Sequence, residues 1–345
     1  MGKRRSNISG LARFVFETAV ASPQPDPSLS AETTKGDKVS VPPDTIGRRG
    51  GSDGLDNRPK KRAKLQTGLL GPDLEKYDVT GLVPFYTEAS QVPPHLQKYF
   101  SQRERYFSLY SSGCLLDEEG WYSVTPEAIA DQIAERCRCD VILDAFCGVG
   151  GNAIAFAKTC ERVIALDVSP VRLALARHNA ALYGVEDRIE FILADFFSFA
   201  RTLKQRPGRK IDVVFMSPPW GGPSYISGTS SESQSSKTAS SSSSPPVAVH
   251  DPPEETYADY SLSSVRPVHG AELFKIARGI TNNIAYFLPR TTSLEEVSRL
   301  VSTQDASTTA SERVEVEEEW MGSKLKALTC YFGGLVAGQE DLFDA

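Results

Sequence analysis

The chain has 345 residues, a formal net charge of −6, 40% hydrophobic and 24% charged residues, which is the composition of a soluble globular protein. It contains no run of about 18 apolar residues, which excludes a transmembrane helix, and charges interrupt the N-terminal segment, so no signal peptide is expected. The six cysteines form no CxxC pair; we therefore predict neither a zinc site nor a disulfide framework, and a reducing compartment is favoured.

The charge is distributed unevenly along the chain. Residues 1–64 carry 13 Lys and Arg against 7 Asp and Glu, a net of +6, which leaves −12 for the remainder. This stretch is rich in Pro, Gly and Ser, and we predict a disordered basic arm over residues 1–75. The run RPKKRAK at 58–64 is interpreted as a nuclear localisation signal or a nucleic-acid-binding arm, with a solvated tail as the alternative.

A small helical N-terminal extension is predicted over residues 76–137, because LQKYFSQRERYFSLY places apolar and aromatic residues at helical spacing. Strands and helices then alternate. Strands are expected at 139–145, 162–167, 188–193 and 211–216, and helices at 152–160, 170–183 and 197–203.

The alternation resumes beyond a serine-rich tract. Helices are expected at 271–281 and 293–301, and strands at 283–288, 314–320 and 324–332. The tract is therefore predicted to be a disordered insertion, at about 226–256, in a core of residues 138–345. The pattern predicts an α/β fold with a doubly wound, mostly parallel, seven-stranded Rossmann-like sheet. Its last two strands form an antiparallel hairpin.

A glycine-rich turn follows the first of these strands. It contains Asp144, Gly148 and Gly150 and opens a helix, while Asp167 ends the second strand. Such a turn fits NAD, FAD or S-adenosylmethionine, and a bare structural turn would also need glycine. Asp144 suits an ammonium or sulfonium group better than a pyrophosphate. Together with Asp195 at the end of the third strand and the closing hairpin, it favours S-adenosylmethionine.

The sequence Ser217-Pro218-Pro219-Trp220 lies at the carboxyl end of the fourth strand, beside the expected cofactor crevice. The prolines fix the backbone, so carbonyl groups and the Ser217 hydroxyl could hold an exocyclic amine. Trp220 offers a flat face to a purine, and stacking is stronger for a cationic base. The alternative is a proline-rich turn with a packed tryptophan.

These motifs resemble a known family. SPPW matches the [DNS]PP[YFW] signature of amino-methylating enzymes. With DAFCGVGGN, ALARHNAALYGV, SPPWGGP, ITNNIAYFLPR and EGWYSVTPE, the chain from about Leu96 to Leu335 resembles the trimethylguanosine synthases, the RNA cap guanine-N2 methyltransferases. The resemblance implies methyl transfer from S-adenosylmethionine to the exocyclic N2 of the 7-methylguanosine cap of small nuclear and nucleolar RNAs, giving the 2,2,7-trimethylguanosine cap.

The resemblance also implies roles for individual residues. Ser217 and Pro218 would line the methyl-transfer point, and Trp220 would stack on the 7-methylguanine. Asn179 would lie near the guanine, and Arg290 and Lys98 would bind the cap phosphates. The cofactor would be surrounded by Phe107, Glu119, Thr125, Asp144, Gly148, Gly150, Asp167 and Asp195, and no metal is expected.

The expected partners are capped small nuclear and nucleolar RNA and the RNP proteins that deliver it. We expect a monomer without membrane association, in the nucleus and nucleolus, with the cytoplasm as a further compartment. Because no histidine lies at a position that the motifs assign to catalysis, orientation rather than a general base should drive the reaction. The charge of −12 predicts recognition confined to the cap and its first phosphates. The alternatives are a methyltransferase for another amino group, and a non-catalytic cap-binding adaptor.

Overall fold

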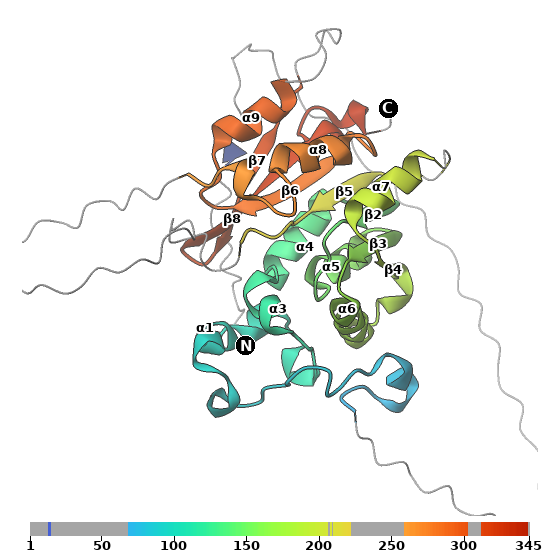
Figure 1. Ribbon diagram of the computed structural model, residues 1–345, viewed down its shortest axis with the longest axis vertical. Helices are drawn as coiled ribbons and strands as arrows, with labels where there is room; N and C mark the ends of the chain where they lie inside the picture. Colours follow the sequence, from blue (N-terminus) through green and yellow to red (C-terminus); the bar gives the residue numbers. More distant parts are fainter. Residues whose placement is uncertain are drawn as a thin grey trace, which may run out of the picture. The chain divides into compact units, whose positions relative to one another are not determined.

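The structure is a computed structural model that describes residues 13–14, 68–205, 208, 210–221, 259–302 and 312–343. Most of the predicted disordered arm and the whole serine-rich insertion lie outside the described residues. One eight-stranded sheet organises the described chain, with the order β1-β7-β8-β6-β5-β2-β3-β4 (Figure 1).

Five adjacent strands are parallel, as predicted. Except at the edge of the sheet, where one strand is partly exposed, each is a short buried apolar run, as expected for strands that are covered on both faces. They are β2 (Val141–Asp144), β3 (Arg162–Asp167), β4 (Ile189–Leu193), β5 (Val213–Met216) and β6 (Ile284–Pro289).

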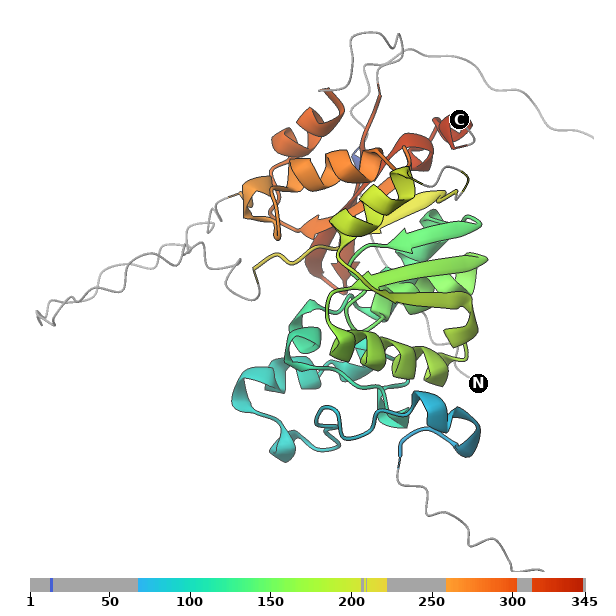
Figure 2. The ribbon, with the colours of Figure 1, turned by 45° about the vertical axis from the view of Figure 1, so that its right-hand side comes forward.

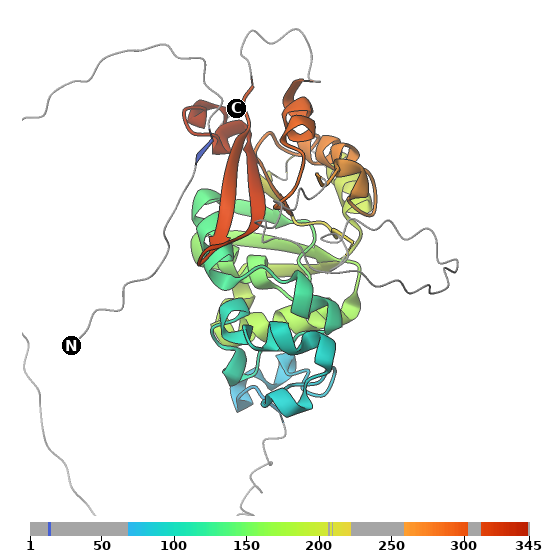
Figure 3. The same cartoon turned by 90° about the vertical axis from the view of Figure 1, so that its left-hand side faces the viewer.

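The predicted C-terminal hairpin is confirmed. It consists of β7 (Glu315–Met321) and β8 (Lys324–Phe332), and β8 runs antiparallel to β6. Figure 3 shows the hairpin directed towards the end of the sheet where the N-terminal extension lies. The eighth strand, β1 (Arg13–Phe14), pairs with β7 and lies within the predicted disordered arm. Two residues give no periodicity, so only their pairing with an edge strand defines it.

Helices cover both faces of the sheet, which confirms the doubly wound prediction (Figure 2). One face packs against α4 (Glu127–Arg136), α5 (Gly151–Thr159) and α6 (Pro170–Tyr183). The other face packs against α7 (Phe196–Lys204), α8 (Gly270–Arg278) and α9 (Leu294–Ser302). Among the described helices, none has the length and apolar character needed to cross a membrane.

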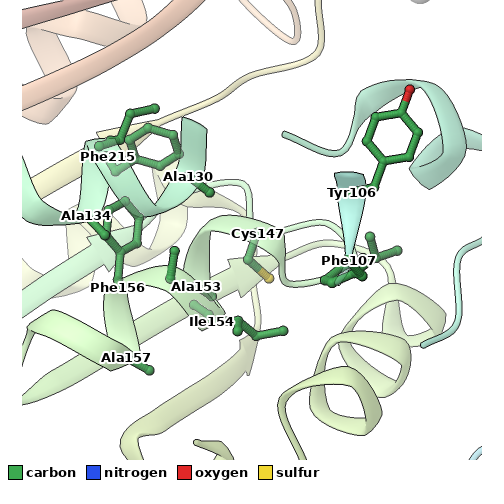
Figure 4. Packing of buried hydrophobic residues seen from close by; sticks show 14 of the residues in the cluster. Tyr106, Phe107, Ala130, Ala134, Cys147, Ala153, Ile154, Phe156, Ala157 and Phe215 are labelled. Carbon is green, nitrogen blue, oxygen red and sulfur yellow. The ribbon is translucent and has the colours of Figure 1, made fainter. Parts of the chain in front are cut away.

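The N-terminal extension is helical but is broken into short pieces. These are α1 (Gln97–Phe100), α2 (Arg103–Tyr106) and α3 (Glu118–Ser123), with a 3-10 turn at Tyr110–Ser112 between α2 and α3. Their aromatic side chains join the same hydrophobic cluster as α4, α5 and α6. In Figure 4, Phe107 lies on the side of this cluster that carries Cys147 and Ile154. The extension is therefore packed onto the sheet domain rather than tethered to it.

Candidate active site

The predicted site residues converge at one edge of the sheet because parallel strands end on the same side. Asp144 of β2 pairs with Ala165 of β3 and with Phe215 of β5, and Asp167 pairs with Leu193 of β4. The glycine turn follows β2, Asp167 ends β3, Asp195 comes after β4 and Ser217 follows β5. These residues therefore lie next to one another. This edge is where ligands bind in open α/β sheets.

Asp167 shapes the glycine turn. Its Oδ2 accepts a hydrogen bond from the Gly148 backbone N–H at 3.0 Å, and its Oδ1 accepts one from the Ser169 N–H at 2.8 Å. Gly148 and Gly150 have φ values of +53° and +94°, which favour glycine. A Cβ at Gly148 would meet nothing within 4 Å, which leaves room for a ligand, whereas a Cβ at Gly150 would lie 3.1 Å from the Ala176 Cα.

Asp144 is a completely buried carboxyl group. Its Oδ1 accepts a hydrogen bond from the Phe146 N–H at 3.3 Å, and its Oδ2 has no partner among the described residues. Burial, with a contribution from the Asp167 charge, raises the pKa of Asp144 to about 7. The ionised form of such a buried carboxyl group is stabilised most by a cationic ligand group, so Asp144 fits the methionine end of S-adenosylmethionine.

Two exposed apolar residues flank the carboxylates at this edge. Val168, which follows Asp167 in the chain, is 69% exposed, and Leu193, the register partner of Asp167, is 58% exposed. Asp195 begins α7, and its side chain accepts a hydrogen bond from the Ser198 N–H at 2.9 Å, which lowers the pKa of Asp195. Apolar surface between carboxylates suits a planar base with a ribose. The sequence analysis did not select Val168 or Leu193, because exposure cannot be read from an apolar residue at a strand end.

The extension closes over the glycine turn. A Cβ at Gly151 would lie 2.9 Å from the Val124 side chain and 3.7 Å from the Thr125 carbonyl oxygen, so buried Thr125 adjoins the turn. Glu119 forms an ion pair with Arg172 of α6. Arg172 also pairs with Asp117 at 3.0 Å, and this clamp joins α3 to α6. Phe107 is buried, and its ring centroid lies 6.2 Å from that of Tyr183.

The loop Ser217–Trp220 is held from both sides. The Trp220 ring is half-buried, and its centroid lies 5.3 Å from that of Phe287 on β6. The Pro219 carbonyl accepts a hydrogen bond from the Arg266 N–H at 3.2 Å, and the Trp220 carbonyl accepts one from the Tyr260 hydroxyl at 3.4 Å. The segment that follows the serine-rich insertion therefore fixes the loop. Sequence spacing gave no sign of this support.

Asn179, which is predicted to lie near the guanine, is bound to backbone groups of the protein. Its side chain is completely buried, and its Oδ1 accepts a hydrogen bond from the Leu115 N–H at 2.8 Å. Its Nδ2 donates to the Leu115 carbonyl at 2.9 Å and to the Val149 carbonyl at 3.0 Å. Both amide hydrogens are used, so Asn179 joins the extension to the glycine turn. Its neighbour His178 contacts the Gly113 carbonyl oxygen at 3.0 Å, and burial lowers the pKa of His178.

We expect Asn179→Ala to destabilise the fold by about 3 kcal/mol, because it leaves buried backbone groups without hydrogen-bond partners. Urea unfolding would measure the loss. The preference for 7-methylguanosine over guanosine caps should stay unchanged in the folded variant. A stable variant that had lost the preference for the 7-methylguanosine cap would instead support the prediction that Asn179 contacts the guanine.

The two predicted phosphate-binding cations lie on different elements. Arg290 is half-buried and directly follows β6, the neighbour of β5. Lys98 is exposed on α1, and its Nζ lies 4.8 Å from the centroid of the Tyr99 ring.

Comparisons with known proteins identify the family. The family model for RNA cap guanine-N2 methyltransferases matches residues 139–243 and 242–335. The trimethylguanosine synthase of Schizosaccharomyces pombe is 35% identical over 246 residues, covering 70% of this chain and 87% of that protein. The trimethylguanosine synthase of Saccharomyces cerevisiae is 32% identical, covering 59% and 58%. An S-adenosylmethionine-dependent methyltransferase structure from Agrobacterium tumefaciens is 16% identical, covers 61% and 63%, and has a TM-score of 0.39. The chain belongs to the RNA cap guanine-N2 methyltransferase family, and it is an S-adenosylmethionine-dependent enzyme.

Proposed function

We propose that the enzyme adds two methyl groups to the exocyclic N2 of the 7-methylguanosine cap on small nuclear and nucleolar RNAs, giving the 2,2,7-trimethylguanosine cap. The observation that carries this proposal is the register of β2 and β5, which sets the loop Ser217–Trp220 beside the glycine turn. A nucleus-resident monomer that receives its RNA from RNP proteins is the corresponding cellular setting.

S-adenosylmethionine supplies an electrophilic methyl group on a sulfonium centre. The chain's own contribution at this end is a set of carboxylates at the sheet edge. Asp144 would face the methionine cation, Asp167 would accept hydrogen bonds from the ribose hydroxyls, and Asp195 would accept one from the adenine amino group. Phe107, Glu119 and Thr125 of the extension cover this region and exclude water.

At the substrate end, Trp220 stacks on the 7-methylguanine ring, whose positive charge strengthens its attraction to an indole face. The packing of the indole against Phe287 supports this role, because it fixes the ring before the base arrives. Ser217 and the Pro218 carbonyl hold the N2 amine so that its lone pair faces the methyl group. Lys98 and Arg290 bind the cap phosphates.

The residues supply orientation rather than proton transfer. His178, which adjoins the motif, is buried and bound to backbone groups of the extension. The amine can lose its proton to water once the new bond has formed. Positioning two reactants in this way contributes much of the rate in such reactions.

Cofactor binding should depend on pH through Asp144. The pKa of Asp144 is raised to about 7, and a cationic ligand favours the ionised form. Affinity for S-adenosylmethionine should therefore rise as pH increases through 7 and level off above it. We expect roughly tenfold weaker binding at pH 6 than at pH 8. Calorimetry on the wild type and on Asp144→Asn would test this, since the variant should be weak and independent of pH.

A substrate panel with radiolabelled cofactor tests the proposed function. The panel contains a 7-methylguanosine cap dinucleotide, its unmethylated counterpart, an uncapped oligoribonucleotide and a glutamine-containing peptide. Labelling of the 7-methylguanosine cap alone is the expected result. Preferred labelling of the oligoribonucleotide or the peptide would indicate a methyltransferase for another amino group. Cap binding without labelling would indicate an adaptor.

A further inference from the structure

A cluster of cations lies beside Arg290 at the active-site edge of the sheet. Pro289 of β6 pairs with Ala327 of β8, so Arg290 follows β6 next to Lys326. Lys324 begins β8 at the turn of the hairpin, which Figure 3 shows directed towards the extension. Arg105 of α2 comes from that extension. We call Arg105, Lys324 and Lys326 the hairpin cluster.

The hairpin cluster is crowded with like charge. Burial, with the charges of Lys324, Arg105 and Arg290, lowers the pKa of Lys326. Arg105 and Lys324 are exposed and Lys326 is half-buried. In the described part of the chain, no ion pair or side-chain hydrogen bond compensates these three cations. By contrast, Arg172 and Arg278 each form ion pairs with acidic residues. A polyanion would relieve this repulsion.

The position of the hairpin cluster indicates which polyanion would bind there. Trp220 follows β5 and packs on Phe287 of β6, and β8 is the next strand outward. Two strand spacings separate β5 from β8, about 10 Å. A cap whose base lies at Trp220 and whose phosphates lie at Arg290 would therefore continue outward over β8.

We propose that Arg105, Lys324 and Lys326 bind the backbone phosphates of the nucleotides that follow the cap. The inference rests on the proposed function and extends it from the cap to the RNA body. It differs from the expectation, drawn from the net charge of −12, that recognition is confined to the cap and its first phosphates. Net charge is a poor guide here, because salt screens charges beyond about 10 Å and the local cluster dominates.

The test compares two capped substrates: a 7-methylguanosine cap dinucleotide, and the same cap on a short unstructured oligoribonucleotide. The full-length wild type is compared with the triple variant Arg105→Gln/Lys324→Gln/Lys326→Gln. The matched control is Arg162→Gln/Lys204→Gln/Lys275→Gln, three exposed cations on β3, α7 and α8. Methyl transfer gives kcat/KM, and fluorescence anisotropy gives RNA binding independently of catalysis.

Three phosphate contacts contribute a salt slope of about −2 for single-stranded RNA. The wild-type preference for capped RNA, measured as its kcat/KM divided by that of the dinucleotide, should thus fall roughly 20-fold between about 50 and 200 mM salt. The triple variant should lose that preference and its salt dependence, with dinucleotide activity within about twofold of wild type. A triple variant that kept both, or a control that lost them equally, would overturn the inference. Failure of the proposed function would show separately, as wild-type inactivity on the dinucleotide.

Discussion

Trp220→Ala is expected to lower kcat/KM for the 7-methylguanosine cap by roughly 30- to 150-fold. The stacking of a cationic base on an indole is worth about 2–3 kcal/mol when the pair is desolvated. The loss should appear mainly in KM for the cap, because the carboxylates that we propose to bind the cofactor lie on other strands. Steady-state kinetics with a cap dinucleotide, together with calorimetry of S-adenosylmethionine binding, would separate the two effects.

The control for this prediction is Trp220→Phe, which keeps an aromatic face over Phe287 and should retain most activity. The unmethylated guanosine cap gives a second control, because a neutral base gains less from stacking. Trp220→Ala should therefore reduce the ratio of kcat/KM for the methylated cap to kcat/KM for the unmethylated cap. An alanine variant that kept the full wild-type preference would show that the positive charge is recognised elsewhere.

Asp167→Ala is expected to weaken S-adenosylmethionine binding about 100-fold. The substitution would remove the acceptor that we propose for the ribose hydroxyls, and hydrogen bonds to charged groups contribute about 1.5–3 kcal/mol each. It also removes the acceptor of the Gly148 and Ser169 N–H groups, so the glycine turn loses its shape. Calorimetry would measure the affinity.

Asp167→Asn is a milder change, because its one remaining oxygen can still accept from one of the two turn N–H groups, Gly148 or Ser169. Its affinity should lie between those of the wild type and the alanine variant. Asp187→Ala, at an exposed position after α6, is the matched control and should bind normally. Wild-type affinity in Asp167→Ala would exclude the ribose contact.

The strands and long helices could be predicted because local signals agree with the fold. For example, α6 begins at Pro170 after the capping residue Ser169 and ends at Gly184, which has a left-handed conformation. The predicted and observed bounds of α6, β3 and β8 coincide. The pairing of β1 with β7 could not be predicted, because two residues carry no pattern and the contact is between distant segments.

The same distinction holds for the candidate site. Asp144, Asp167 and Ser217 could be brought together from the sequence, because each follows a parallel strand and such ends share an edge. The hydrogen bonds of Asn179 to the extension could not be predicted, because the motif does not reveal which way a helical side chain points. The support of Trp220 by Tyr260 and Arg266 depends on segments about 40 residues apart in the chain.

The hairpin cluster could not be predicted from the sequence, for a related reason. Its members come from α2 and β8, which only the packing of the extension brings near Arg290. The summed charge of the core suggested that only the cap and its first phosphates are recognised, because that sum averages a few clustered cations with acidic residues spread over the other surfaces. Folded position, rather than composition, decides where an RNA chain can bind.

The most direct test of the account is the identity of the product. The wild-type enzyme is incubated with S-adenosylmethionine and a 7-methylguanosine cap dinucleotide, and the digested nucleosides are analysed by mass spectrometry. We expect a cap nucleoside with two added methyl groups, both on the exocyclic N2, and no product from the unmethylated cap. Methylation at another atom, or equal methylation of both caps, would contradict it.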